Sequence, residues 1–375
     1  MSKWDIVAGL YNTTFTLFLF LLAFLMFLIA YKGFKANNRY GGTSTVISGI
    51  IFIIFGYYNS IFWFLPYPYC GYMVWWIGII LGIFMAFALI IRNVIKKMEA
   101  GIEKQTHLTK FIDLMTQENP YKDQISIKME AIRKSFHLAG LLFILAYFGF
   151  FFIPPITQLV NNNVIVFIQD QEWSYNLLWG DIHDQYPYVK NDFQAIIDLT
   201  LFALFATLVL AILSDIIRVL WGPEYSVFNF LTRAVLRKKE YNAAGPQIYL
   251  VSGVISAYMF YVIGVVHILV VVAGVLVACF SDALAAIIGR RYGKHKVTCI
   301  GGDVKSVEGF IAGAGSAFVI AFIFVGPIYA LIAAIIFFLL DYFPVIIADN
   351  ILNPILITLG IGIAVALLGL PFGWF

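Results

Sequence analysis

Charged residues are scarce in this sequence. They make up 12% of its 375 residues, whereas 62% of the residues are hydrophobic. Apolar runs of about 20 residues recur along the chain, and each has the length that a membrane-crossing helix needs. The composition therefore argues against a water-soluble protein and predicts a polytopic integral membrane protein.

Three further absences narrow the possible functions. The cysteines, Cys70, Cys279 and Cys299, form neither a disulfide framework nor the spacing of a metal site. The pattern G-x-x-x-x-G-K-[ST] is missing, and Gly313 and Gly315 lie within an apolar run, which excludes a soluble P-loop nucleotide domain. No A-x-A-like cleavage site accompanies the first apolar run, so we expect this run to be retained as a membrane helix.

The apolar runs predict an all-α bundle of about ten membrane helices. The predicted spans lie near residues 9–31, 43–65, 71–94, 136–153, 196–220, 247–264, 266–288, 307–325, 327–347 and 354–372. We expect a three-helix N-terminal extension (1–94), a cytosolic linker (95–132) and a seven-helix membrane core (133–375). An apolar stripe in the linker predicts either a helix on the membrane surface or a solvated segment. The stripe consists of Leu108, Phe111, Ile112 and Met115.

The basic residues predict one orientation in the membrane. With the N-terminus outside, 22 of the 24 Lys and Arg residues fall on the inner side, and only Lys3 and Lys190 fall outside. This partition follows the positive-inside rule and needs no nucleic-acid partner to explain it. We expect the protein in the plasma membrane or the endoplasmic reticulum. Asn12 opens a glycosylation sequon beside the first predicted span.

The stretch from Asp282 to Gly309 combines a carboxylate, cations and a helix start within 28 residues. At helical spacing, small side chains share one face with Asp282, which lies within an apolar run where a carboxylate is costly. These small residues are Ala285, Ala286, Gly289 and Gly293. The following cations favour phosphates, as does the next helix start. A nucleoside-triphosphate and metal site at the membrane surface is one interpretation; a positive-inside anchor beside a helix-packing face is the alternative.

The pattern D-x-x-A-x-x-x-G-x-x-x-G-K, followed by K-S-x-E-G, resembles the signature of the CTP-dependent lipid-alcohol kinases. This family includes dolichol kinase, phytol and farnesol kinases, and the CTP-using diacylglycerol kinase. The matching residues are Asp282, Ala285, Gly289, Gly293, Lys294, Lys305, Ser306, Glu308 and Gly309. This two-part match is long and therefore fairly specific.

Three shorter elements extend the resemblance over about residues 130–372. The first is R-K-x-x-H, formed by Arg133, Lys134 and His137, and the second is an L-R-K-x-E run with Arg237, Lys238 and Glu240. The third is Asp349-Asn350 followed by Pro354, preceded by Asp341 where the family more often has glutamate. All of them fall on the predicted inner side or close to it.

The resemblance implies transfer of the γ-phosphoryl group of CTP to a long-chain isoprenoid alcohol, giving a polyprenyl phosphate and CDP. It implies that Asp282 binds Mg²⁺, with Glu308 or Asp349 as a second ligand, and that Asp349 or Asp215 accepts the alcohol proton. Lys294, Lys305, Arg133 and Lys134 would clamp the phosphates. The other matched residues expected at the nucleotide are His137, Arg237, Lys238, Glu240, Gly289, Gly293, Ser306, Gly309 and Asn350. The preference for CTP over ATP comes from the resemblance alone.

Several alternatives stay open from the sequence. Asp215 and Arg218 are three residues apart on a helix, where a salt bridge is the simpler explanation. A CDP-lipid synthase would share the CTP requirement and the site at the membrane boundary. A transporter would place ionisable groups near the membrane midplane and often shows inverted repeats, whereas the candidate residues here cluster on one face.

Overall fold

The computed structural model describes residues 3–101, 106–116, 173, 192–229, 242–299, 304–343 and 345–371. The N-terminal helices are α1 (Lys3–Lys35), α2 (Arg39–Phe62), α3 (Tyr69–Glu99) and α4 (His107–Thr116). They are followed by α9 (Asp192–Leu220), the short η2 (Pro223–Tyr225), α11 (Pro246–Val262), α12 (Ile268–Leu276), η4 (Val277–Ser281) and α13 (Asp282–Tyr292). Strands β1 (Lys296–Thr298) and β2 (Val304–Ser306) precede α14 (Val307–Val325), α15 (Pro327–Tyr342) and α16 (Asp349–Leu368).

The prediction of a helical membrane protein is confirmed. Among the described residues, seven helices are long and apolar enough to cross a membrane, and the shorter helices α11 and α15 are also apolar. The seven are Trp4–Lys35, Arg39–Phe62, Tyr69–Glu99, Ile196–Leu220, Ile268–Tyr292, Val307–Val325 and Asp349–Leu368. Each of these nine segments overlaps a predicted span. The remaining predicted span, 136–153, lies outside the described residues, so the number of ten stays a prediction.

Local sequence explains where several helices begin and end. The Asn38 side chain accepts a hydrogen bond from the Gly41 N–H and so caps the start of α2. Helix α14 ends at Val325 and is followed by Gly326, whose φ of 83° suits glycine, and Pro327 directly begins α15. Lys96 and Lys97 lie in the last turn of α3, where cations interact favourably with the helix dipole.

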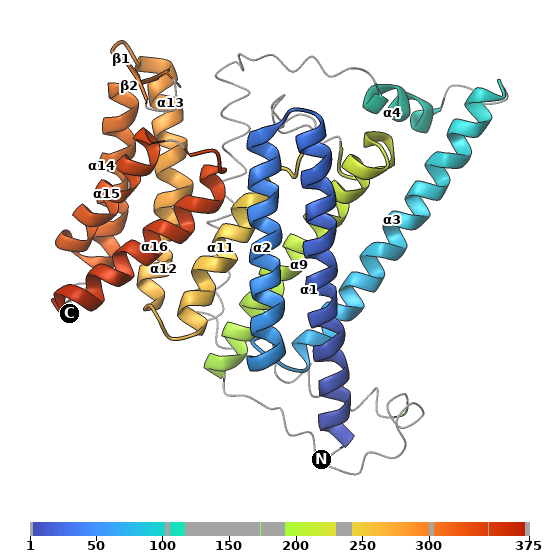
Figure 1. Ribbon diagram of the computed structural model, residues 1–375, viewed down its shortest axis with the longest axis horizontal. Coiled ribbons are helices and arrows are strands. Elements are labelled where there is room, and N and C mark those ends of the chain that lie inside the picture. Colours follow the sequence, from blue (N-terminus) through green and yellow to red (C-terminus); the bar gives the residue numbers. More distant parts are fainter. Residues whose placement is uncertain are drawn as a thin grey trace.

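The N-terminal helices share one core with the rest of the bundle. Figure 1 shows α1 and α2 side by side at its centre, with α11 to α16 on one side and α3 on the other. The Phe205 ring of α9 lies 5.8 Å from that of Phe15 in α1 and 5.5 Å from that of Phe55 in α2, both edge-on. The predicted extension 1–94 therefore packs directly onto helices of the predicted core.

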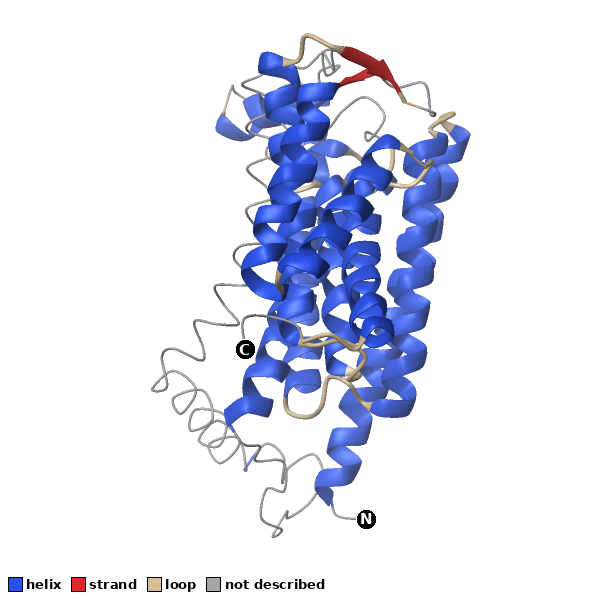
Figure 2. Ribbon diagram, turned by 90° about the vertical axis from the view of Figure 1, so that its left-hand side faces the viewer, coloured by secondary structure: helices blue, strands red, loops and turns tan. Residues whose placement is uncertain are grey.

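The basic turn that precedes α14 contains a small β-hairpin that the sequence did not predict. Strands β1 and β2 pair in antiparallel register, with Val297 opposite Lys305. Figure 2 shows the hairpin at the end of the bundle away from the N-terminus. The α1–α2 turn and the C-terminal end of α3 lie at this same end (Figure 1). These three basic segments therefore lie at one end of the molecule. This agrees with the predicted placement of most Lys and Arg residues on one side of the membrane.

Packing explains the positions of the apolar stripe in the linker and of the sequon residue Asn12. Helix α4 forms at the predicted apolar stripe, but Ile112 packs against Ile91 and Val94 of α3, so this part of the stripe is covered by protein. The sequon residue Asn12 is buried, and its side-chain oxygen accepts a hydrogen bond of 2.8 Å from Asn59 of α2. In the folded chain Asn12 therefore joins α1 to α2.

Candidate functional site at the hairpin end of the bundle

Asp282 follows an irregular turn inside a long apolar helix. Residues Ile268–Tyr292 form one apolar stretch, in which the π-helical η4 separates α12 from α13. Single π-helical turns within α-helices occur frequently at functional sites. Asp282 begins α13 and is partly exposed. At 1.5 Å per residue it lies about 15 Å along the helix from its end at Tyr292.

The stripe of small residues is a helix-packing face, as the alternative interpretation predicted. A methyl group added to Gly309 of α14 would lie 3.0 Å from the Ala285 carbonyl oxygen and 3.2 Å from the Gly289 Cα atom. One added to Gly313 would lie 3.0 Å from the Ala285 Cβ atom. Helices α13 and α14 therefore approach each other as closely as only small residues permit.

Ser306 fixes the start of α14 against the end of α13. Its hydroxyl oxygen accepts a hydrogen bond of 3.1 Å from the Gly309 N–H and donates one of 3.3 Å to the Gly289 carbonyl. A methyl group added to Gly293 would lie 2.5 Å from this hydroxyl oxygen. The prediction of a helix start at Ser306 is confirmed, and the glycines around it allow the turn to close.

Lys305 of β2 is paired with Asp341 at the end of α15. Its ammonium group lies 2.6 Å from the Asp341 carboxylate and donates to the Asp341 backbone oxygen at 2.7 Å. Burial by itself lowers the pKa of Lys305, but the charge and hydrogen bond of Asp341, aided by the charge of Asp349, raise that pKa above its usual value. The ammonium group therefore stays charged at physiological pH. The folded chain thus brings Lys305, Asp341 and Asp349 into one electrostatic group.

Glu308 points toward the hairpin rather than toward Asp282. Its carboxylate lies 2.7 Å from Nδ1 of the exposed His295 and accepts the His295 N–H at 3.2 Å. Because Gly309 packs against Gly289, Glu308 lies near the level of Gly289, which is about 10 Å along α13 from Asp282. Two carboxylates that bind one Mg²⁺ ion directly must both come within about 2.1 Å of it. In this arrangement Asp282 and Glu308 do not converge on a single ion.

Asp349 and Asn350 open α16 at the same end of the molecule. The Asn350 side chain donates a hydrogen bond of 3.4 Å to the Pro246 carbonyl at the start of α11. A methyl group added to Gly253 of α11 would lie 2.7 Å from the Asn350 carbonyl oxygen. The start of α16 is therefore held tightly against α11.

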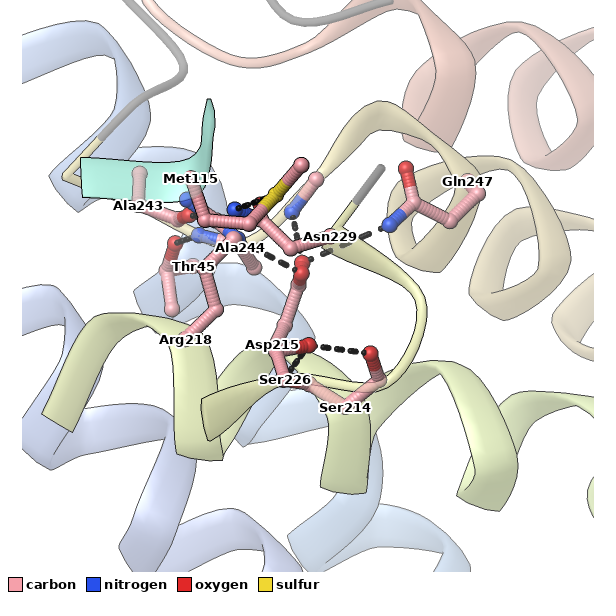
Figure 3. A network of polar contacts seen from close by, with 11 residues as sticks. Thr45, Met115, Ser214, Asp215, Arg218, Ser226, Asn229, Ala243, Ala244 and Gln247 are labelled. Atoms are coloured by element: carbon pink, nitrogen blue, oxygen red, sulfur yellow. Dashed lines mark hydrogen bonds and ion pairs between the residues drawn. The ribbon is translucent and has the colours of Figure 1, made fainter. Parts of the chain in front are cut away.

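Asp215 lies in a separate, fully satisfied network (Figure 3). One of its carboxylate oxygens is 2.9 Å from the Arg218 side chain, and the other accepts the Gly245 N–H at 2.6 Å. Arg218 also donates to the Ala243 carbonyl at 2.7 Å. The salt bridge predicted from the spacing is confirmed, and it ties α9 to the segment that leads into α11.

The structure describes only part of the predicted phosphate clamp. Lys294 is exposed beside the hairpin. The other basic elements, which comprise Arg133, Lys134, His137, Arg237, Lys238 and Glu240, lie outside the described residues. Within the described ranges, no group of three His, Cys, Asp or Glu side chains could hold a metal ion.

Sequence reasoning missed two features of this site. It did not pair Lys305 with Asp341, which lie 36 residues apart, and it gave no role to His295. Asp341 lies near the end of a helix and Lys305 lies in a short strand. No sequence pattern links these two positions, so the contact could not be predicted.

Comparisons with protein families, with curated proteins and with solved structures found no match to this chain. The case for a function therefore depends on the residues of the site and on the motif resemblance.

Proposed function

We propose that this protein is a CTP-dependent lipid kinase that transfers the γ-phosphoryl group of CTP to the hydroxyl of a long-chain isoprenoid alcohol such as dolichol or polyprenol. The observation that carries this proposal is the position of Lys305. Lys305 lies just before α14 at one end of an apolar helical bundle, and its charged ammonium group is partly exposed. The ammonium group contacts Asp341 and is influenced by the charge of Asp349. A water-soluble nucleotide and a membrane-embedded alcohol can meet only at such a boundary.

Phosphoryl transfer needs charge neutralisation and positioning more than it needs covalent chemistry. In the proposed mechanism Lys305 leaves Asp341 and binds the phosphates, because a phosphate offers the ammonium group a partner of higher charge. Lys294 and the predicted clamp residues Arg133 and Lys134 would add further positive charge. The glycine-lined start of α14 holds Ser306 and the backbone near Lys305 in a fixed geometry.

A magnesium ion would fit Asp282 if phosphate and water oxygens supply most of its ligands. Mg²⁺ commonly binds through one or two carboxylates together with substrate phosphates, so a complete protein cage is not required. Such an ion would neutralise charge on the phosphates. Glu308 would have to leave His295 to join it, and Asp349 is the alternative second carboxylate.

Asp349 is also the better of the two candidate proton acceptors for the alcohol. Both oxygens of the buried Asp215 already accept hydrogen bonds, from Arg218, Gly245 and the half-buried Gln247. Asp349 lies at the start of α16, on the side of the bundle where Lys305 is found. We therefore assign Asp215 a structural role and Asp349 the role of orienting and deprotonating the hydroxyl.

The orientation follows from the same proposal. Cytosolic CTP requires the hairpin end to face the cytosol and the N-terminus to face outward, in the plasma membrane or the endoplasmic reticulum. The native cysteines are buried, so a cysteine introduced at Lys296 can be probed over a low background. We expect it to be protected from impermeant thiol reagents in intact cells. Labelling there would contradict the proposed orientation.

The function is tested with CTP labelled at the γ-phosphate. Purified protein, a polyprenol and labelled CTP should yield labelled lipid and unlabelled CDP. A CDP-lipid synthase would instead attach CMP to a lipid phosphate and release the label in pyrophosphate. A matched reaction with phosphatidate in place of the alcohol serves as the control, and label found only in pyrophosphate would replace the kinase by the synthase.

A further inference from the structure

Ser44 of α2 makes a direct contact with the start of α16. The Ser44 hydroxyl donates a hydrogen bond of 2.8 Å to the Tyr40 carbonyl and accepts one of 2.9 Å from the Ala348 N–H. Because its proton is directed at Tyr40, the oxygen lone pairs are oriented toward Ala348. Both Ser44 and Ala348 are buried. Ser44 lies outside residues 130–372, over which the resemblance to the lipid kinases extends.

The contact falls at a sensitive position in α16. Ala348 is the N-cap residue of this helix, and its side chain cannot accept the hydrogen bond that a polar capping residue would. Ser44 instead holds the backbone of that residue from another helix. Asp349 follows directly, and its charge already acts on Lys305. A shift at Ala348 therefore changes where the Asp349 carboxylate lies.

A second route joins α2 to the same place. The Thr45 hydroxyl oxygen accepts the Ala244 N–H at 3.3 Å, and a methyl group added to Gly41 would lie 2.5 Å from the Ala243 Cβ atom. The segment so held continues to Pro246, whose carbonyl accepts the hydrogen bond from Asn350. Helix α2 thus supports the start of α16 both directly and through the segment before α11 (Figure 3 shows Thr45 beside Ala243 and Ala244).

We infer that Ser44 is a positioning residue that places Asp349 for the phosphoryl transfer, an inference that rests on the proposed function. Helix α2 is then part of the catalytic support and not an accessory membrane anchor. Ser44 acts through the Ala348 backbone and contacts neither nucleotide nor alcohol. Loss of its hydroxyl should accordingly slow turnover and leave CTP binding nearly unchanged.

The test compares Ser44→Ala with Ser48→Ala. Ser48 lies one turn further along α2, is equally buried, and its hydroxyl has no hydrogen-bond partner among the described residues. We expect Ser44→Ala to lower kcat about tenfold, a barrier change of about 1.4 kcal/mol, with the KM for CTP within about twofold. Ser48→Ala should match the wild type. Hydrogen exchange should accelerate in the peptide that covers Ala348 to Leu352 in Ser44→Ala only.

Ser44→Cys provides a second variant if Ser44→Ala does not fold. The thiol is somewhat larger than the hydroxyl and is a weaker acceptor for the Ala348 N–H, so the kcat of this variant should fall between those of the wild type and Ser44→Ala. Equal kcat values in the Ser44 and Ser48 variants, or a raised KM with unchanged kcat, would overturn the inference. Unchanged exchange at the start of α16 in an active Ser44→Ala protein would do the same. Failure of the wild type to phosphorylate any alcohol would instead remove the proposed function itself.

Discussion

Two acid–base pairs of similar length have different surroundings in this protein. Arg218 and Asp215 approach to 2.9 Å with side chains that are 2% and 0% exposed, whereas Lys305 and Asp341 approach to 2.6 Å at 29% and 16% exposure. The buried pair has further fixed backbone partners on both of its side chains. The two pairs are therefore similar in distance but differ in exposure and in the number of backbone groups that hold them.

The two pairs therefore differ in the free energy that it costs to separate their charges. Removing Arg218 would leave the Asp215 carboxylate buried without its cation, a desolvation cost of several kcal/mol that the hydrogen bonds from Gly245 and Gln247 offset only in part. Lys305 is partly exposed and can be rehydrated at a smaller cost when it loses Asp341. The buried pair therefore stabilises the fold, whereas the partly exposed pair leaves Lys305 available for the phosphate-binding role that we propose for it.

The strongest test of this contrast is the stability of two alanine variants. We expect Arg218→Ala to lower the free energy of unfolding by about 3–5 kcal/mol and Lys305→Ala by less than about 1 kcal/mol. Denaturant unfolding in detergent would measure both. Similar losses in the two variants would break the distinction between the pairs.

The next test compares two carboxylates by activity. Asp282→Asn keeps the size and hydrogen-bonding capacity of the side chain but removes the charge proposed to hold Mg²⁺. We expect at least about a hundredfold loss of CTP-dependent phosphorylation, about 2.7 kcal/mol in the barrier, with the melting temperature in detergent preserved. Asp215→Asn is the matched control and should lower the melting temperature. Substantial turnover by Asp282→Asn would remove Asp282 from the metal site.

The test with the smallest expected effect asks whether Lys305 binds phosphate or only anchors the protein at the membrane surface. An anchor works equally well as Arg, but a compact ammonium between Asp341 and the start of α14 differs in shape from the planar guanidinium fork. We expect Lys305→Arg to lower activity about tenfold, or about 1.4 kcal/mol in the barrier. Lys296→Arg, on the exposed strand β1 of the same hairpin, should have little effect. Equal, small effects at both positions would leave the hairpin as an anchor and shift the clamp to Arg133, Lys134 and Arg237.

Features with a local signature could be predicted from the sequence. The apolar helices follow from runs of suitable length, and the Asp215–Arg218 pair follows from a spacing of three residues on one helix. Small residues at helical spacing predict a face that a neighbouring backbone or a ligand can approach closely, and Gly289 indeed lies against Gly309. In each case the relevant residues lie on one helix or on consecutive helices, so their spacing along the chain already restricts how they meet.

The partners of the site residues were decided only by the tertiary structure. Lys305 meets Asp341 because α14 and α15 run out and back between them, and Ser44 meets Ala348 across 304 positions of the chain. The sequence places a lysine, a serine and several carboxylates near helix ends. No regular spacing along the chain indicates that these residues meet in the folded protein. Glu308 turned toward His295, and not toward Asp282, for the same reason. Periodicity determines which face of a helix is buried, whereas the packing of distant helices determines which charges share a site.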